Sequence, residues 1–182
     1  ESKITDGDVT RQWKLPEEDE NNNISSYYHS ANYQKHVIML DFKNGEDYTK
    51  LKDLIKDADV VITNFLKDTA DKLKIGLNEL NEINNKLIIV QLSAFDYDDN
   101  IPGFDLVMQA ECGYVSMCGT EAALAKMPVA IIDILASHQM KQAILIGLIH
   151  KIKTGSGSTH FVSLFKSGIS GLINQGTNYL MS

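Results

Sequence analysis

The feature that most constrains the fold is a series of short, continuously apolar runs separated by amphipathic segments. The runs lie at residues 36–42, 60–62 and 87–92, and between the first two, residues 46–58 carry apolar side chains at helical spacing. Strands that are apolar at every position are buried on both faces, and crossover helices between such strands produce a parallel sheet. The pattern therefore predicts an α/β fold with a Rossmann-like parallel sheet and helices on both faces.

The remaining periodicities extend this fold toward the C-terminus. A Gly- and Ser-rich cluster, TGSGST at residues 154–159, predicts a turn between a helix and a strand. A chain of 182 residues, 43% of them hydrophobic, can bury one sizeable core, so we expect a single α/β domain over residues 1–182. The later predicted elements are helical segments at residues 69–73, 77–83 and 104–116, a long helix at about 133–153, a strand at 160–165 and a C-terminal helix.

Both ends of the sequence look cut. The chain begins without a strand or helix of its own and stops inside a helical pattern, whereas domains usually end in a polar tail or a cap. We therefore expect an incomplete large domain that lacks N-terminal and C-terminal parts.

Composition and charge exclude several classes of protein. The net charge of −7 comes from 24 acidic and 17 basic residues without a Lys/Arg block, which indicates no nucleic-acid partner. Polar and charged residues interrupt the longest apolar stretch, 127–152, which argues against a membrane span. Cys112 and Cys118 have the spacing of neither a zinc pair nor a disulfide framework, and the polar residues 1–11 lack the apolar core of a signal peptide, so we expect a cytoplasmic protein.

Common motifs for phosphate binding, nucleophilic serine and zinc are absent from the sequence. It contains no G-x-G-x-x-G, P-loop, G-x-S-x-G or H-E-x-x-H, and its five histidines do not stand at metal-ligand spacing. We therefore expect no metal site.

Asp133 is the most unusual residue, because it places a charge inside the apolar run 127–136. It fits a helix cap, which accepts hydrogen bonds from free backbone N–H groups, and it also fits a catalytic carboxylate. Taken alone, the residues favour the cap, and both roles can coexist. Hydrogen bonds from the helix terminus would lower the pKa of this carboxyl and burial would raise it, and the ionised form can attack a thioester.

Weaker candidates are one polar pair and several lysines. Asp105 and Gln109 stand four residues apart on a predicted helix, where a local polar pair is the favoured interpretation. The lysines near predicted strand ends are either solvated surface residues or cations for ligand phosphates, and spacing alone decides nothing here. These lysines are Lys35, Lys43, Lys67 and Lys72.

Several segments together resemble class III CoA transferases, the CaiB/BaiF type that includes formyl-CoA transferase and also acyl-CoA racemases. GDVTR at residues 7–11 is similar to the family's GDxTR, ADVVITNF at 58–65 to ADVVIENF, and PGFDLVMQA at 102–110 to PGFDxxxQA. The segments NYQK with LDFK at 32–43, LKIGL at 73–77 and TGSG with VSL at 154–164 also resemble family motifs. The match runs over nearly the whole chain.

The resemblance implies a catalytic role for Asp133, which stands where the family has the aspartate of VPxxD. Its carboxylate would attack an acyl-CoA thioester and form a mixed anhydride, then an aspartyl-CoA thioester that a carboxylic acid acceptor opens. CoA is a substrate in this chemistry, and no metal or redox cofactor is needed. The family also implies an interlocked homodimer for the intact protein.

A CoA site at the strand ends also follows from the resemblance. Lys43 and Lys72 would bind phosphate oxygens as charge-assisted donors. Pro102, Gly103, Phe104 and Asp105 would border the acyl group. The full set of implied contact residues is Leu40, Asp41, Phe42, Lys43, Asn64, Phe65, Leu66, Lys72, Pro102, Gly103, Phe104 and Asp105.

Two departures from the family pattern bear on function. Phe104 stands where the racemases have a histidine, and a phenyl ring cannot exchange a proton, which favours a transferase over an α-methylacyl-CoA racemase-like isomerase. The family's glycine-rich loop, which supplies donors for the oxyanion, is not visible in these residues. A truncated CoA-binding polypeptide without activity is therefore a further alternative.

Overall fold

The computed structural model describes residue 1 and residues 7–182, and residues 2–6 of the polar N-terminal stretch lie outside the described part. The chain divides into two compact units, Glu1–Leu54 and Ile55–Ser182, each of which is described by itself. That residues 1–182 form a single domain stays a prediction.

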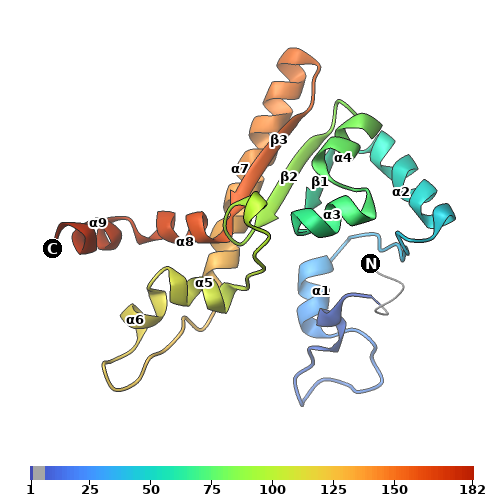
Figure 1. The fold of residues 1–182 in the computed structure, drawn as a ribbon. Helices are drawn as coiled ribbons and strands as arrows, with labels where there is room; N and C mark the ends of the chain where they lie inside the picture. The colour runs from blue at the N-terminus through green and yellow to red at the C-terminus, as the bar shows by residue number, and fades with distance from the viewer. Residues whose placement is uncertain (2–6) are drawn as a thin grey trace. The chain divides into compact units, whose positions relative to one another are not determined.

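The second unit is built on a parallel sheet (Figure 1). Its strands are β1 (Val60–Thr63), β2 (Ile88–Ser93) and β3 (Ser158–Ser163), in the order β1-β2-β3. Val60 pairs with Ile88, and Ile88 pairs in turn with Ser158. The central strand β2 is the most deeply buried, as its continuous apolar run predicts. The predicted α/β fold with a parallel sheet flanked by helices is confirmed.

Helices connect and cover these strands. Between β1 and β2 lie α3 (Lys67–Leu73) and α4 (Leu77–Ile83), and the 24-residue α7 (Ile131–Thr154) leads into β3 and packs along it and β2 (Figure 1). The core includes Ile88, Val90, Met108, Ile132 and Val162. The other helices of this unit are η2 (Tyr97–Asp99), α5 (Asp105–Glu111), α6 (Tyr114–Cys118), α8 (Leu164–Leu172) and α9 (Asn174–Met181).

Two glycines shape the predicted turn between α7 and β3. Gly155 ends α7 with a left-handed φ of 74°, and its N–H donates to the carbonyl of Lys151 at 2.8 Å. Gly157 runs so close to the start of β2 that a Cβ there would lie 2.2 Å from the Leu87 carbonyl oxygen. The turn is therefore fixed both by helix termination and by backbone contact.

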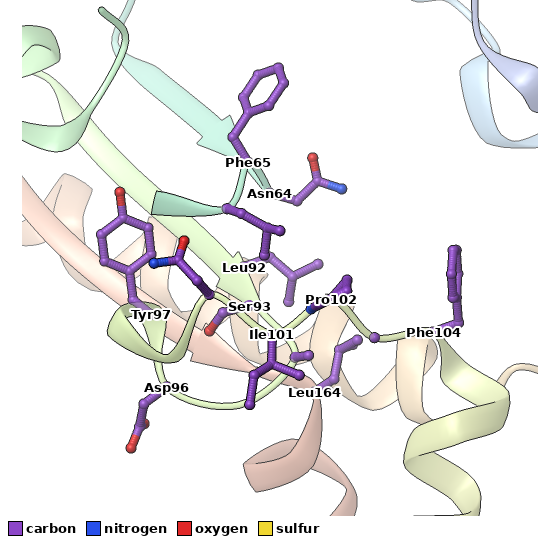
Figure 2. Close-up of a pocket in the computed structure, with 14 residues that line it drawn as sticks. Asn64, Phe65, Leu92, Ser93, Asp96, Tyr97, Ile101, Pro102, Phe104 and Leu164 are labelled. Atoms are coloured by element: carbon purple, nitrogen blue, oxygen red, sulfur yellow. The ribbon is translucent and has the colours of Figure 1, made fainter. Parts of the chain in front are cut away.

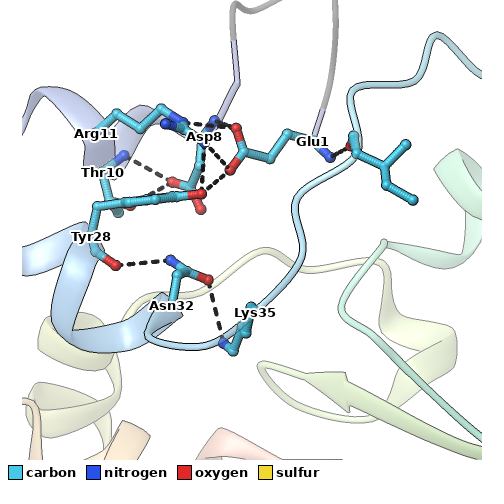
Figure 3. A network of polar contacts seen from close by, with 8 residues as sticks. Glu1, Asp8, Thr10, Arg11, Tyr28, Asn32 and Lys35 are labelled. Carbon is cyan, nitrogen blue, oxygen red and sulfur yellow. Dashed lines mark hydrogen bonds and ion pairs between the residues drawn. The ribbon is translucent and has the colours of Figure 1, made fainter. Parts of the chain in front are cut away.

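The first unit contains short helices held by polar contacts (Figure 3). They are η1 (Val9–Gln12), α1 (Ser26–Asn32) and the start of α2 (Gly45–Asp57), which ends in the second unit. Arg11 donates two hydrogen bonds of 2.8 Å to the Glu1 carboxylate, and Tyr28 donates a further one. The Arg11 guanidinium, more than Tyr28, lowers the pKa of Glu1 to about 2. In the GDVTR segment, the Asp8 carboxylate accepts from the N–H of Thr10 at 2.8 Å and caps η1.

The predicted strand at residues 36–42 is wrong. Ile38 and Leu40 exchange backbone hydrogen bonds of 2.7 and 2.9 Å with Glu1, but within the described residues this segment joins no sheet ladder. Leu40 is a single bridge residue there, and two contacts to one residue do not make a continuous strand. Leu40 is buried, whereas Val37 and Ile38 are each 45% exposed.

The predicted helices otherwise lie close to their expected bounds, with two splits. The predicted C-terminal helix divides into α8 and α9 at Ile173. The helical pattern at 104–116 divides into α5 and α6 at Gly113, where φ is 84°. Both cysteines, buried Cys112 and exposed Cys118, are free. Across the described ranges, no helix combines the length and the apolar character that crossing a bilayer requires.

Candidate active site

A cavity of about 220 Å³ opens at the carboxyl ends of β1 and β2 (Figure 2). The turn after β1, the end of β2, the loop that carries η2 and the start of α8 form its walls. Ligands of open parallel sheets bind at this end of the strands, where successive loops converge. The position therefore marks the cavity as the candidate ligand site of the second unit.

Six of the residues that the resemblance implies lie together around this cavity. They come from two segments that are distant in sequence, the turn after β1 and the loop before α5. The role of these six in CoA binding stays a prediction. They are Asn64, Phe65, Leu66, Pro102, Gly103 and Phe104.

Four of the lining residues that were not predicted as contacts come from one loop. Asp96, Tyr97, Asn100 and Ile101 belong to the η2 loop, which follows β2 and lines the cavity. Asn100 exchanges hydrogen bonds of 2.9 and 3.0 Å with Asp68 at the start of α3, so the loop is tied to the helix after β1. Turn residues directly after a buried strand were the signal that could have identified this loop.

Lys72 and Lys67 lie apart from the cavity lining. Lys72 is exposed on α3, and Lys67 forms an ion pair of 2.8 Å with Asp71 on the same helix. The hydrogen bond to Asp71 raises the pKa of Lys67, so the lysine stays charged. The structure thus supports the solvated-surface interpretation for Lys67 and leaves Lys72 accessible.

The predicted contact residues of the first unit form a turn before α2. Asp41 accepts a hydrogen bond of 2.9 Å from the N–H of Lys43, and its own N–H donates to the Asp47 carboxylate at 3.0 Å. Leu40 is buried and Phe42 is partly buried, which leaves Lys43 as the exposed cation of this segment. Its backbone is held while its ammonium group faces solvent.

Asp133 occupies the first turn of α7, but it is not the cap of the helix. The N-cap position belongs to Ala130, and within the described part of the chain no donor is hydrogen-bonded to the exposed carboxylate of Asp133. The expectation that Asp133 caps the helix is therefore wrong. A residue from another helix does so, because the free N–H groups at a helix start can be satisfied from any direction.

That residue is Asp105, the first residue of α5. Its Oδ1 accepts hydrogen bonds from the N–H groups of Ile132 at 2.8 Å and Asp133 at 3.4 Å, and its Oδ2 accepts one from Gln109 Nε2 at 2.6 Å. The predicted Asp105–Gln109 pair is confirmed. The hydrogen bonds from α7 to Asp105 were not predicted, because sequence spacing does not reveal contacts between separate helices.

The electrostatics of Asp133 follow from this arrangement. Although the residue is exposed, the protein around its carboxyl partly desolvates it, and this desolvation, followed by the negative charge of Asp105, raises the pKa of Asp133. The lowering expected from helix N-terminal donors does not occur because Asp105 has taken those donors. Among the residues that the structure describes, no donor thus engages the oxygens of the Asp133 carboxylate.

Asp133 is linked to the cavity wall by Phe104 and Asp105, which are adjacent in sequence. Phe104 lines the cavity and is 75% exposed, and Asp105, next to it, binds the first turn of α7. Asp133 itself is not among the lining residues. The arrangement offers a cavity of mixed polar and apolar lining, and a carboxylate on the helix turn that Asp105 holds, which is a group capable of nucleophilic attack on an acyl carbon.

Known proteins are similar to this chain in sequence and in fold. The chain matches the family described as CoA-transferase family III over residues 1–182. It is 34% identical over 184 residues to the succinate–glutarate CoA-transferase of Agrobacterium fabrum, covering 97% of this chain and 46% of the relative. It is 28% identical to the human succinyl-CoA:glutarate CoA-transferase, with 96% and 40% covered.

Solved structures agree with this relationship. The crystal structure of a CaiB/BaiF family protein from Brucella suis superposes with a TM-score of 0.89 at 31% identity, covering 97% of this chain and 48% of that one. The chain spans about half the length of the relatives it matches. On the family match, the sequence identity and the shared fold, the chain belongs to CoA-transferase family III.

Proposed function

We propose that the protein transfers coenzyme A from an acyl-CoA to a small carboxylic acid, with Asp133 as the nucleophile. The proposal is supported by membership in CoA-transferase family III and by relatives that are named CoA-transferases. The observation that carries it is the Asp133 carboxylate, which is exposed in the first turn of α7 and accepts no hydrogen bond from the described residues, since Asp105 caps the helix.

In the first half of the reaction, one Asp133 oxygen attacks the thioester carbon of the donor. The carbon–sulfur bond breaks, CoA leaves as a thiolate, and a mixed anhydride remains on Asp133. The thiolate then attacks the carbonyl carbon of Asp133 in this anhydride. The bond to the donor acid breaks, the donor leaves as a carboxylate, and an aspartyl-CoA thioester remains.

The second half reverses these steps with the acceptor. The acceptor carboxylate attacks the aspartyl thioester carbon and displaces CoA thiolate, which gives a new mixed anhydride. The thiolate attacks the acyl carbon of the acceptor, forms the product thioester and releases the Asp133 carboxylate. No electron is gained or lost, and the chemistry balances without a metal or a redox cofactor.

CoA would lie along the predicted contact residues. The cavity, at about 220 Å³, is smaller than the roughly 300–1,000 Å³ of pockets for drug-sized ligands, so it would hold one portion of CoA and leave the rest outside. The exposed lysines Lys43 and Lys72 would bind phosphate oxygens. Pro102, Gly103, Phe104 and Asp105 would border the acyl group, in a cytoplasmic, interlocked homodimer.

The test is an exchange assay on the protein expressed from its full open reading frame. Succinyl-CoA and glutarate, named for the relatives, form the first substrate pair of a wider acyl-CoA panel. We expect new thioester in the wild type and a loss of at least about a thousandfold in kcat for Asp133→Asn, because the variant lacks the attacking oxygen. Full exchange by Asp133→Asn would contradict the proposal, as would CoA binding without exchange for every pair.

A further inference from the structure

We infer that Asp105 and Gln109 are positioning residues that hold Asp133 in place, through a hydrogen-bonded clamp between α5 and residues 127–133. This inference deepens the proposed function and rests on it for its kinetic consequences. The clamp itself consists of contacts between side chains of α5 and the backbone of the segment that enters α7.

Gln109 uses both ends of its amide in the clamp. Its Oε1 accepts from the N–H of Met127 at 2.8 Å, and its Nε2 donates to the carbonyl of Val129 at 3.1 Å and to Asp105 Oδ2 at 2.6 Å. Turning the amide over would place its NH₂ group against the Met127 N–H. Gln109 is fully buried, where an unpaired polar group is strongly unfavourable, so this orientation is enforced.

Asp105 continues the clamp into α7. One of its oxygens is held by Gln109, and the other accepts from the N–H groups of Ile132 and Asp133. The Ile132 side chain is fully buried in the core, which fixes the same turn from the opposite side. Because the direction of a helical side chain follows its backbone, fixing these two peptide groups sets where the Asp133 carboxyl points.

The clamp also keeps Asp133 available. An aspartate in the first turn of a helix ordinarily turns back to the free N–H groups and the positive end of the dipole. Asp105 supplies the negative charge and the acceptor there instead, so no donor in residues 1 and 7–182 engages the Asp133 oxygens. Within the described residues, Asp105 of α5 is the charged group that acts on the Asp133 carboxyl, and its charge raises the pKa of Asp133.

Charge-swapping variants test the clamp in the protein from the full open reading frame. Asp105→Asn sets an NH₂ group against Gln109 Nε2, and Gln109→Glu sets a carboxylate against the Asp105 carboxylate. The double variant Asp105→Asn/Gln109→Glu restores a donor opposite an acceptor between residues 105 and 109, while the hydrogen bond to the Val129 carbonyl stays lost. We expect each single variant to lower kcat about 10- to 100-fold with the KM for acyl-CoA within about threefold, because displacement of a reacting group by about 1 Å costs on the order of 100-fold.

Three results would support the inference. The double variant has a higher kcat than Gln109→Glu alone, since the donor–acceptor pair between residues 105 and 109 is rebuilt. The acid limb of kcat against pH moves to lower pH in Asp105→Asn, because a charge that raises the pKa of Asp133 is removed. Asp59→Asn, the matched control that removes an ion pair of 3.0 Å with Lys151 near the other end of α7, leaves kcat and the acid limb unchanged.

A second measurement separates the clamp from the chemistry. Hydrogen exchange of the Ile132 and Asp133 amides should quicken in Asp105→Ala and stay unchanged in Asp59→Asn. Unchanged exchange in Asp105→Ala, or wild-type kcat and acid limb in both single variants, would overturn the inference. If the wild type itself transfers no CoA, the proposed function fails, and the exchange rates still decide whether the clamp exists.

Discussion

At the scale of the residue, Asp133 shows how a charge can be placed in an apolar run without serving as a cap. The sequence alone favoured the cap, because an aspartate beside a helix start normally fills that role. The structure gives the role to Asp105, whose contact with residues 132 and 133 spans two helices and leaves no trace in local spacing. The sequence shows the apolar neighbours of Asp133, but it does not show that Asp105 caps the helix in its place.

Asp133 should lower the stability of the fold when it is ionised. Its folded-state pKa is raised, so the folded protein pays an energetic penalty for the charge at neutral pH and none below the ordinary carboxyl pKa of 3.8. We expect Asp133→Asn to raise the urea midpoint at pH 7, with the gain vanishing as the pH falls below 3.8. A lower midpoint for the variant at pH 7 would show that the carboxylate is stabilised instead.

The same raised pKa should appear in catalysis. Attack on a thioester needs the ionised carboxylate, so kcat/KM should fall as the pH drops through the raised pKa of Asp133 in the free enzyme. The acid limb, measured at constant ionic strength, should lie above pH 3.8. An acid limb at or below that value would contradict the assignment of the nucleophile.

At the scale of the element, hydrophobic pattern predicted most helices and strands of the second unit. The runs at 60–62 and 87–92 become β1 and β2, and the long helix and the strand after it lie within a few residues of their predicted bounds. In the described residues the run at 36–42 is not a continuous strand, because an apolar run does not by itself determine which backbone it pairs with. The cavity-lining η2 loop was missed because loops carry no periodicity.

The two glycines of the turn before β3 should differ in their tolerance of a side chain. Gly155 has open space around a Cβ but a left-handed φ, so Gly155→Ala should cost about 1–2 kcal/mol of unfolding free energy. Gly157→Ala should cost more, because its Cβ would lie 2.2 Å from a backbone oxygen of residue 87 that cannot move freely. Chemical denaturation measures both, and equal losses would mean that the backbone contact is unimportant.

At the scale of the whole molecule, the sequence segments predicted the family, and the comparisons and the fold confirm it. The chain spans about half the length of its relatives, so partners, substrates and the predicted dimer belong to the proposal and not to the observed fold. These properties depend on surfaces and residues that local patterns in this chain do not describe.

Phe104 distinguishes CoA transfer from racemisation as the activity of the whole protein. A racemase must remove and return the α-proton of the acyl group, and the phenyl ring at this position of the cavity wall cannot do so. We expect a branched acyl-CoA labelled with deuterium at the α-carbon to keep its label during incubation with the protein. Loss of label that Asp133→Asn abolishes would instead favour the racemase.

The central claim is that the Asp133 carboxylate becomes covalently acylated. The direct measurement is peptide mass spectrometry of the protein from the full open reading frame, incubated with acyl-CoA and quenched with hydroxylamine, which converts an activated carboxyl into a hydroxamate. The account predicts a hydroxamate on Asp133 that depends on acyl-CoA and is absent from Asp133→Asn. An unmodified Asp133 across the acyl-CoA panel, or a hydroxamate on another carboxyl, would contradict it.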